Sequence, residues 1–335
     1  MLIITMDRHP YSSQIFRTKW IKHFTSPPNV IDFESISGQS FLKTKRRSIY
    51  YNTGSNFTLQ HYYCINNPVH SKELNKKTII IYDVPNYFVI NNRFENPKIK
   101  IVKVKEYIGY LIDTNGVTSL ESYIKSRFSS KKRTQIKGYI KKIEATFNIQ
   151  YKMFFGEITK IEYDSIMKYF YDLSIISFNK KKIKNTKLIP KNFAFTREVL
   201  FDLIQLQQAS IFVIYNDKIP IGISLNYNSD TILFGDSTVY DSSYSKFNVG
   251  TIMLIKQLEW CFSKGIKKFD FSKGYFPYKK TWCNTPYHFE HHIIFDSSSF
   301  LTKITAYRHI YYLKLKQFLR EHPLRNYLKS LIKKN

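Results

Sequence analysis

Two aspartates in the C-terminal half of the chain have the type and surroundings that a general base needs. Asp270 lies between Phe269 and Phe271 in an apolar run, and partial desolvation makes a carboxylate a better proton acceptor. Asp236 follows a second apolar run and is another candidate for a general base. Asp270 could equally be a structural acid paired with Lys279, so the sequence leaves the choice of base open.

A candidate anion site lies at Asn248, Val249, Gly250 and Thr251, at the start of a long apolar helix pattern. The first turn of a helix carries unsatisfied amides and the positive end of the helix dipole. Gly250 has no side chain that would keep a phosphate away from these amides. Many helices begin with asparagine and glycine for conformational reasons alone, so the alternative is a plain helix start.

The segments on both sides of this turn predict a sheet that would hold these residues. β-Branched runs separated by Asn-Asp and Asn-Ser-Asp turns predict three consecutive antiparallel strands, at 210–215, 219–227 and 231–234. A helix is predicted over 249–264, ended by a left-handed Gly265, and a buried strand over 266–271 follows at once. Such a crossover predicts that the new strand lies parallel in the same sheet.

Two capping boxes, Thr118 to Glu121 and Thr159 to Glu162, predict helices further towards the N-terminus. The first is a basic helix to Phe147 with a kink or break within 129–134, and the second runs to about Ile176. Other elements are predicted from composition and periodicity: strands at 77–82, 100–104, 150–155 and 288–295, a lysine-rich mobile loop at 179–192, a helix capped by Thr196, and a basic C-terminal helix broken by Pro323. We expect Asp83, Val84 and Pro85 to end the strand at 77–82.

The residues from Phe269 to Trp282 carry a family resemblance. They read Asp270-Phe-x-x-Gly274-x-x-x-Tyr278-Lys279-x-x-Trp282, and they follow shortly after the helix that begins near Gly250. This ending resembles that of one GNAT-superfamily branch, the cellulose-biosynthesis acetyltransferases, and the resemblance extends over about residues 111–295. It reaches more weakly to the N-terminal part, which in that branch and in the related Fem-type aminoacyl transferases is a second, degenerate domain. The implied fold is α/β (α+β), with tandem GNAT-like domains in which helices flank a mixed sheet.

The resemblance also implies a reaction and the roles of several residues. The donor would be acetyl-CoA or another acyl-CoA, lying where two strands splay apart with its pyrophosphate at the amides near Gly250. Asp236 would face the meeting point of thioester and acceptor, Tyr278 would be the general acid, and Lys279 would stabilise negative charge. The wider superfamily's phosphate loop is reduced here to Gly250, so an aminoacyl-tRNA donor, as in Fem-type enzymes, stays open. A non-catalytic GNAT-fold binding module is a further alternative, and no metal is expected because the histidines match no ligand spacing.

The net charge of +27 is concentrated in a few segments. Residues 125–142, 180–191 and 301–335 together hold 23 lysines and arginines and one acid. Such clusters favour anionic partners, although a charged run can also be a solvated surface. The basic helix and the motif supply the candidates for binding a small acceptor, such as an amino sugar, a nucleotide sugar or another phosphorylated sugar: Arg127, Arg133, Lys137 and Trp282. tRNA is the alternative anionic partner.

Composition limits the class of protein and its surroundings. No run approaches the roughly 18 apolar residues of a membrane-spanning helix. The three widely spaced cysteines, Cys64, Cys261 and Cys283, predict reduced thiols in a cytoplasmic protein. In the C-terminal segment, apolar residues such as Tyr311 and Phe318 lie among cations. This segment could contact an anionic membrane surface, or it could pack on the domain with a solvated basic side.

We expect four segments along the chain. They are a degenerate N-terminal GNAT-like domain at 1–117, a basic linking helix at 118–148, a catalytic GNAT domain at 149–299 and a basic helical segment at 300–335. The branch that the motif resembles places the expected activity in polysaccharide biosynthesis.

Overall fold

The computed structural model describes residues 8–44, 48–54, 57, 59–66, 72–90, 94–181 and 185–321. These residues form two compact units. The first unit comprises the described parts of 8–19, 110–272 and 276–286, and the second unit those of 20–109, 273–275 and 287–321. Strands β6 (Ile99–Asp113) and β12 (Thr285–Asp296) each contribute to both units. Residues 8–19 thus group with 110–272 in the first unit.

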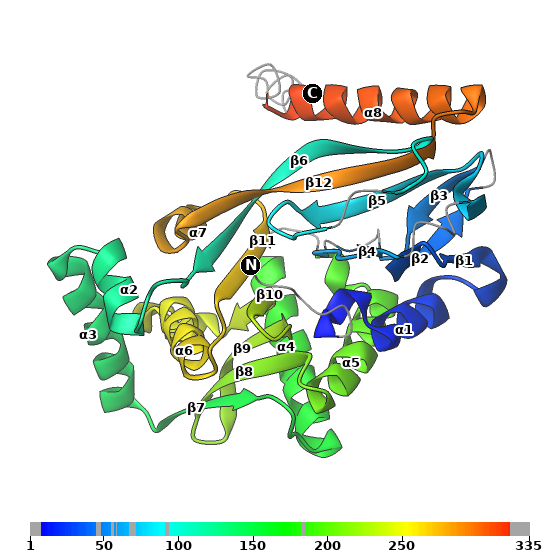
Figure 1. The fold of residues 1–335 in the computed structure, drawn as a ribbon. Helices are drawn as coiled ribbons and strands as arrows, with labels where there is room; N and C mark the ends of the chain where they lie inside the picture. Colours follow the sequence, from blue (N-terminus) through cyan, green and yellow to red (C-terminus); the bar gives the residue numbers. More distant parts are fainter. Residues whose placement is uncertain are drawn as a thin grey trace, which may run out of the picture. The chain divides into compact units, whose positions relative to one another are not determined.

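The first unit is a mixed sheet flanked by helices (Figure 1). Antiparallel pairing joins β7 (Ile149–Phe154), β8 (Ala209–Asn216), β9 (Ile219–Asn228) and β10 (Ile232–Tyr240) in that order, and β11 (Lys268–Lys273) lies parallel to β10. The three predicted antiparallel strands and the parallel crossover are thus confirmed. The helical elements of this unit are η2 (Pro10–Ser12), the start of α1 (Gln14–Phe24), α2 (Leu120–Arg127), α3 (Ser130–Thr146), α4 (Lys160–Lys181), η5 (Thr186–Leu188), α5 (Pro190–Gln205), η6 (Ser242–Phe247), α6 (Val249–Ser263) and α7 (Pro277–Trp282).

Helix ends in the first unit partly follow the predicted signals. Gly265 has a φ of +70° just after α6, which confirms its left-handed role. The basic helix is broken at Ser129, whose hydroxyl accepts a hydrogen bond from the Lys132 amide and so caps α3. The hydroxyl of Thr159 accepts a hydrogen bond from the Glu162 amide at 3.2 Å, which confirms the start of α4.

Three local predictions were wrong. The first capping box uses Ser119 and Ser122 rather than Thr118 and Glu121, because the Ser119 hydroxyl accepts from the Ser122 amide and so starts the helix one residue later. Thr196 does not start a helix: α5 begins at Pro190, and the Thr196 hydroxyl donates to the Asn192 carbonyl within it. The lysine-rich stretch is largely helical, since α4 extends to Lys181 and η5 follows at Thr186; residues 182–184 lie outside the described residues.

The second unit has its own mixed sheet, in the order β1 (Val30–Phe33), β2 (Ile36–Lys43), β3 (Ile49–Asn52), β5 (Thr78–Pro85) and β12, with β4 (Cys64–Ile65) beside β2. The prediction that Asp83 ends its strand was wrong. Asp83 has a φ of +55° opposite a register shift between Glu290 and His292, so β5 bends there and continues to Pro85. The strand predicted at 100–104 is part of the much longer β6.

Helix α8 (Phe300–Glu321) covers one face of the second unit's sheet (Figure 1). Its Ala306, Ile310 and Leu313 pack in one cluster with apolar residues of β3, β5, β6 and β12. The predicted break at Pro323 lies outside the described residues. Across the described residues, no helix is both long and apolar enough to cross a membrane.

Candidate active site

Strands β10 and β11 pair over a short distance and then part. The last pair of their ladder joins Phe234 to Asp270, while β10 continues to Tyr240 beside β9. A register shift between Gly235 and Ser237 marks a bulge at Asp236. The two predicted acids, Asp236 and Asp270, therefore lie at the point where the strands separate.

The topology brings the predicted donor turn and the motif to one edge of the sheet. Because β10 and β11 are parallel and α6 connects them, α6 begins at the edge where both strands end. Helix α7 follows β11 directly and lies at the same edge. Open α/β sheets bind ligands at this edge, beyond the carboxyl ends of parallel strands.

The turn from Asn248 to Thr251 opens α6 with a left-handed residue. Asn248 has a φ of 57° and makes no side-chain cap, and its carbonyl accepts from the Thr251 amide at 2.9 Å. A β-carbon added to Gly250 would lie 3.3 Å from Cε1 of Tyr240. Glycine thus allows the half-exposed Tyr240 ring to lie against the first turn, in space where we had predicted only a phosphate.

Asp236 is held by a lysine that the sequence had placed in a loop. Its Oδ1 lies 2.6 Å from Nζ of Lys187, and its Oδ2 accepts from the Ser237 hydroxyl at 3.0 Å. The Lys187 ammonium also donates to the Asp236 carbonyl and to the Ser237 hydroxyl, both at 3.1 Å. If Asp236 acts as a base, it therefore does so beside the Lys187 ammonium on η5.

Asp270 and Lys279 together shape the end of β11. Asp270 is fully buried, and its Oδ1 accepts a hydrogen bond from the Ser272 amide at 2.6 Å. Ser272 has a left-handed backbone, with a φ of +58°. Lys279 is 3% exposed, and its Nζ donates to the carbonyls of Phe271 at 2.7 Å and of Ser272 at 3.2 Å. Burial lowers the pKa of Lys279 to about 8, and the negative charge of Asp270 partly offsets this. The ammonium is thus engaged with backbone carbonyls.

Tyr278, next to this lysine, is the more accessible motif residue. Its side chain is 47% exposed, and its ring centroid lies 6.2 Å from that of Phe271. Desolvation of the phenol raises the pKa of Tyr278 to about 12. The group is therefore protonated at neutral pH, as a general acid must be before it reacts.

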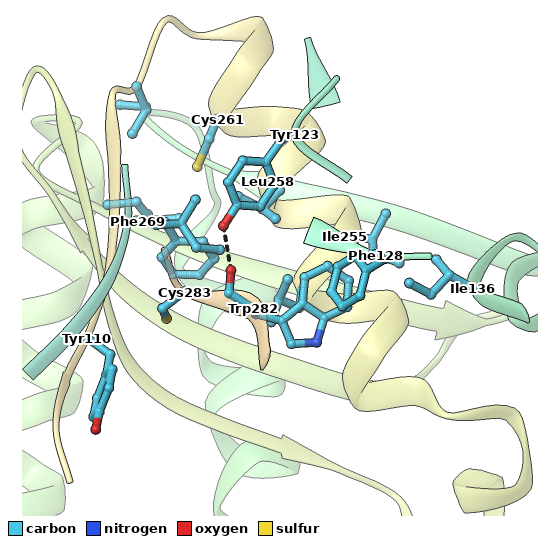
Figure 2. Packing of buried hydrophobic residues seen from close by; sticks show 14 residues of the cluster. Tyr110, Tyr123, Phe128, Ile136, Ile255, Leu258, Cys261, Phe269, Trp282 and Cys283 are labelled. Carbon is cyan, nitrogen blue, oxygen red and sulfur yellow. Dashed lines mark hydrogen bonds between the residues drawn. The ribbon is translucent and has the colours of Figure 1, made fainter. Parts of the chain in front are cut away.

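Trp282 and Arg127 fix α7 to α2 within one apolar cluster. Figure 2 shows the Trp282 ring beside Phe128 and its carbonyl receiving the hydrogen bond from the Tyr123 hydroxyl; the two ring centroids lie 4.6 Å apart. Arg127 Nη2 donates to the carbonyls at the end of α7, those of Lys280, Thr281 and Cys283, at 2.9 to 3.1 Å. Carbonyls at a helix C-terminus lack intrahelical partners, and a cation there satisfies them. Both residues, which we expected to bind the acceptor, are engaged within the protein.

The other two candidates for acceptor binding lie on α3. Arg133 Nη1 donates to the Phe128 carbonyl at 2.8 Å. Lys137 is largely exposed, and its Nζ lies 4.0 Å from Glu121. Of the four acceptor candidates, Lys137 is thus the one whose charge faces solvent.

Two tyrosines near the acids were missed by sequence reasoning. Tyr11 on η2 is buried with its ring centroid 4.9 Å from Tyr227 and 5.7 Å from Phe234. Burial raises the pKa of Tyr11 well above its usual value, and the nearby charges of Asp236 and Asp270 raise it further. No local signal could have indicated this, because Tyr11 is brought to the acids from the far end of the chain.

The described residues offer no metal cluster in place of this arrangement, and a surface pocket lies away from it. Across the described ranges, no three His, Cys, Asp or Glu side chains converge as ligands would. A surface pocket of about 370 Å³ lies at the start of β11, lined by residues such as Thr114, Gly265 and Lys267. None of the candidate site residues lines this pocket.

Residues 130–280 match the family model described as an acetyltransferase (GNAT) domain. Residues 130–280, which we call the GNAT domain for this similarity, make up less than half of the chain. These residues include the parting strands, α6 and most of the motif, so the GNAT domain contains the candidate site. A comparison with curated protein sequences finds no significant match.

Solved structures support the fold of the GNAT domain and of the rest of the chain. FemX has a TM-score of 0.54 at 10% identity, covering 87% of this chain and 96% of its own. L-PGS from Bacillus licheniformis has a TM-score of 0.51 at 11% identity, covering 90% of this chain and 98% of its own. The C-terminal domain of an Agrobacterium fabrum protein described as a lysylphosphatidylglycerol synthetase has a TM-score of 0.50 at 8% identity, covering 83% and 87%. At such low identity these likenesses concern the fold alone.

Proposed function

We propose that the GNAT domain transfers an acyl group from acyl-CoA, acetyl-CoA in the simplest case, to the amine of a small acceptor such as an amino sugar or nucleotide sugar. The observation that carries this is the parting of β10 and β11 at Asp236 and Asp270, on the edge where α6 begins and Tyr278 follows. An extended donor lies with its phosphates at the Gly250 turn and its thioester at the parted strands. The resemblance of the motif suggests a place in polysaccharide biosynthesis, and the three free thiols fit a cytoplasmic enzyme.

The chemistry needs one proton acceptor and one proton donor. The acceptor nitrogen attacks the thioester carbon, a C–N bond forms, and the C–S bond breaks. Asp236 or Asp270 takes the amine proton, directly or through the acceptor's solvation shell, and Tyr278 protonates the leaving thiolate. Both acids are kept as candidates, because each lies at the parting point with a different partner.

Lys279, Arg127 and Trp282 act in this proposal as positioning residues. Lys279 holds the carbonyls at the end of β11, Arg127 holds those at the end of α7, and Trp282 packs α7 on α2. Together they keep Tyr278 beside the strand end. The turn of Asn248, Val249, Gly250 and Thr251 binds the donor's phosphates once the Tyr240 ring turns aside and the Thr251 amide gives up its bond to the Asn248 carbonyl.

The acceptor's anionic groups bind the basic face of α2 and α3. Arg133 orders this face through the Phe128 carbonyl, and Lys137 contributes an exposed charge. The other exposed lysines of the two helices are Lys125, Lys131, Lys141 and Lys142. A face of this kind steers anionic substrates towards the domain.

Donor binding tests the proposal directly. Acetyl-CoA is titrated calorimetrically into the full chain, and saturable binding is expected. Silence with acetyl-CoA and with longer acyl-CoAs, in a sample shown to be folded, would refute it. Gly250→Val should weaken donor binding, whereas Gly138→Val, within α3 and with open space around the glycine, serves as the control for adding the same side chain.

The role of Tyr278 is tested by thiol release from acetyl-CoA with a panel of amino sugars. Tyr278→Phe should lower kcat by about 10²- to 10⁴-fold while donor affinity is kept. Tyr275→Phe makes the same chemical change three residues earlier at an exposed ring, and should leave kcat unchanged. Equal rates for the two variants would remove Tyr278 from the mechanism.

The alternative donor is aminoacyl-tRNA, which the exposed lysines of α2 and α3 favour and which Fem-type enzymes use. Filter binding of tRNA over a salt series separates the two donors. Under the acyl-CoA proposal, tRNA binding is weak, indifferent to sequence and lost near physiological salt. Retention of one aminoacylated species at that salt would favour the Fem-type reaction instead.

A further inference from the structure

Helix α8 of the second unit carries large apolar side chains on its outer side. Its inner side is buried through Thr302, Thr305, Ala306, Ile310 and Leu313, which face the unit's own sheet. The opposite side carries six exposed residues, which we call the outer stripe: Phe300, Ile304, Tyr307, Tyr311, Leu315 and Phe318. In Figure 1, α8 lies along β6 and β12 with these strands on one side of it.

The spacing of the outer stripe is that of a single helix face. Successive members lie three or four residues apart, so they form a line along α8. Phe300 is 74% exposed and Tyr311 65%, and Leu301 at 76% widens the line on one flank. A helix that covers a core and faces water normally carries polar residues at these positions. Besides the exposed cations that the sequence predicted, α8 therefore presents a line of apolar side chains to solvent.

Cations border the outer stripe. Lys303 and Lys314 lie on one flank of it and Arg308 on the other, by their positions around the helix. Glu321, the last residue of α8, is its one acid. The sequence after it, residues 322–335, adds four lysines or arginines and no acid. An apolar face bordered by positive charge matches the boundary between acyl chains and anionic headgroups.

We propose that α8 docks the protein on an anionic lipid surface, with the outer stripe in the acyl–headgroup boundary and the flanking cations among the headgroups. The helix lies in the plane of the surface and the second unit stays outside it. A second copy of the chain fits the face less well, because two such faces would bring their lysines together. This inference is independent of the reaction proposed for the GNAT domain, since no residue of that site takes part.

The test is co-sedimentation of the full chain with vesicles of phosphatidylcholine alone and of phosphatidylcholine mixed with phosphatidylglycerol. Binding is expected to the mixed vesicles and to be much weaker to phosphatidylcholine. No binding to the mixed vesicles, or equal binding to both, overturns the proposal. Light scattering over a concentration series runs in parallel. A dimer that is lost on changing the outer stripe, without vesicle binding, would assign the face to a second copy instead.

Variants separate the apolar and the charged contributions. Tyr311→Ser and Phe318→Ser should each weaken binding to the mixed vesicles about tenfold, for loss of a large buried side chain. Ile161→Ser removes an 86% exposed apolar residue from α4 and should have no effect. Lys303→Gln and Lys314→Gln should each weaken binding about fivefold and leave binding to phosphatidylcholine unchanged. These lysines are exposed, so their variants test the proposal even if the serine variants fold poorly.

Discussion

Lys279 should make the protein's stability rise with pH above neutrality. Its ammonium is buried at the end of β11, which lowers its pKa from 10.5 to about 8 in the folded chain. The unfolded chain therefore binds this proton more tightly than the folded chain does. Below about pH 8 the charged lysine opposes folding, and this penalty disappears as the pH rises from about 8 towards 10.5. We predict that Lys279→Met removes this pH dependence.

The size of the effect follows from the two pKa values. Each pKa unit is worth about 1.4 kcal/mol, so the difference between 10.5 and about 8 corresponds to about 3 kcal/mol. Most of it, about 2 kcal/mol, should appear between about pH 7 and about pH 10 as a gain in the free energy of unfolding. Tyrosines such as Tyr278 also titrate in alkali. The natural chain and the Lys279→Met variant share these tyrosines, so their effect on the free energy of unfolding largely cancels when the two are compared.

The assay is urea unfolding of the natural chain and of Lys279→Met over that pH range. As the pH rises, the free energy of unfolding of the natural chain should increase by about 2 kcal/mol relative to that of the variant. Lys137→Met removes a lysine that is 74% exposed at its side chain, and its curve should run parallel to that of the natural chain. Parallel curves for Lys279→Met as well would refute the argument that burial perturbs this amine.

Three further substitutions test the packing. Gly138→Ala, in the middle of α3 with nothing within 4 Å of the added carbon, should raise the free energy of unfolding by about 1 kcal/mol, and a lower urea midpoint would contradict this. Gly109→Ala should lower it by about 1 to 3 kcal/mol, since the new carbon would lie 2.2 Å from Cζ of Tyr287; an unchanged midpoint would show that the ring moves freely. Arg127→Ala should lower thermal stability by leaving the carbonyls at the end of α7 without their cation, whereas Lys125→Ala, at an exposed position on the same helix, should not.

Local signals determined much of the first unit. The runs around 210–234 and their polar turns act within a few residues, so they indicated β8, β9 and β10 correctly. The helix before Gly265 and the strand after it also fixed the parallel pairing of β10 and β11, because crossovers of this kind have a preferred hand. Asp236 and Asp270 were found as candidates for the same reason: each directly follows or lies within a recognisable strand.

Contacts between distant segments decided the rest of the site. Lys187 beside Asp236, and Tyr11 near both acids, come from parts of the chain with no signal for such a role. Trp282 belongs to a motif, yet only its packing on Phe128 shows that it supports α7 from within. Thr196 carries a capping residue type, but Pro190 starts the helix earlier and leaves that threonine inside it.

Helix α8 separates the two kinds of information most clearly. Its sequence alone showed apolar residues among cations and fixed, through the helical repeat, which side chains share a face. It did not determine which face would be buried, because both Ile310 and Tyr311 are apolar. Packing against the second unit's sheet selected the face with Ile310, since burial depends on the shape of the partner surface, and so left Tyr311 and the outer stripe exposed.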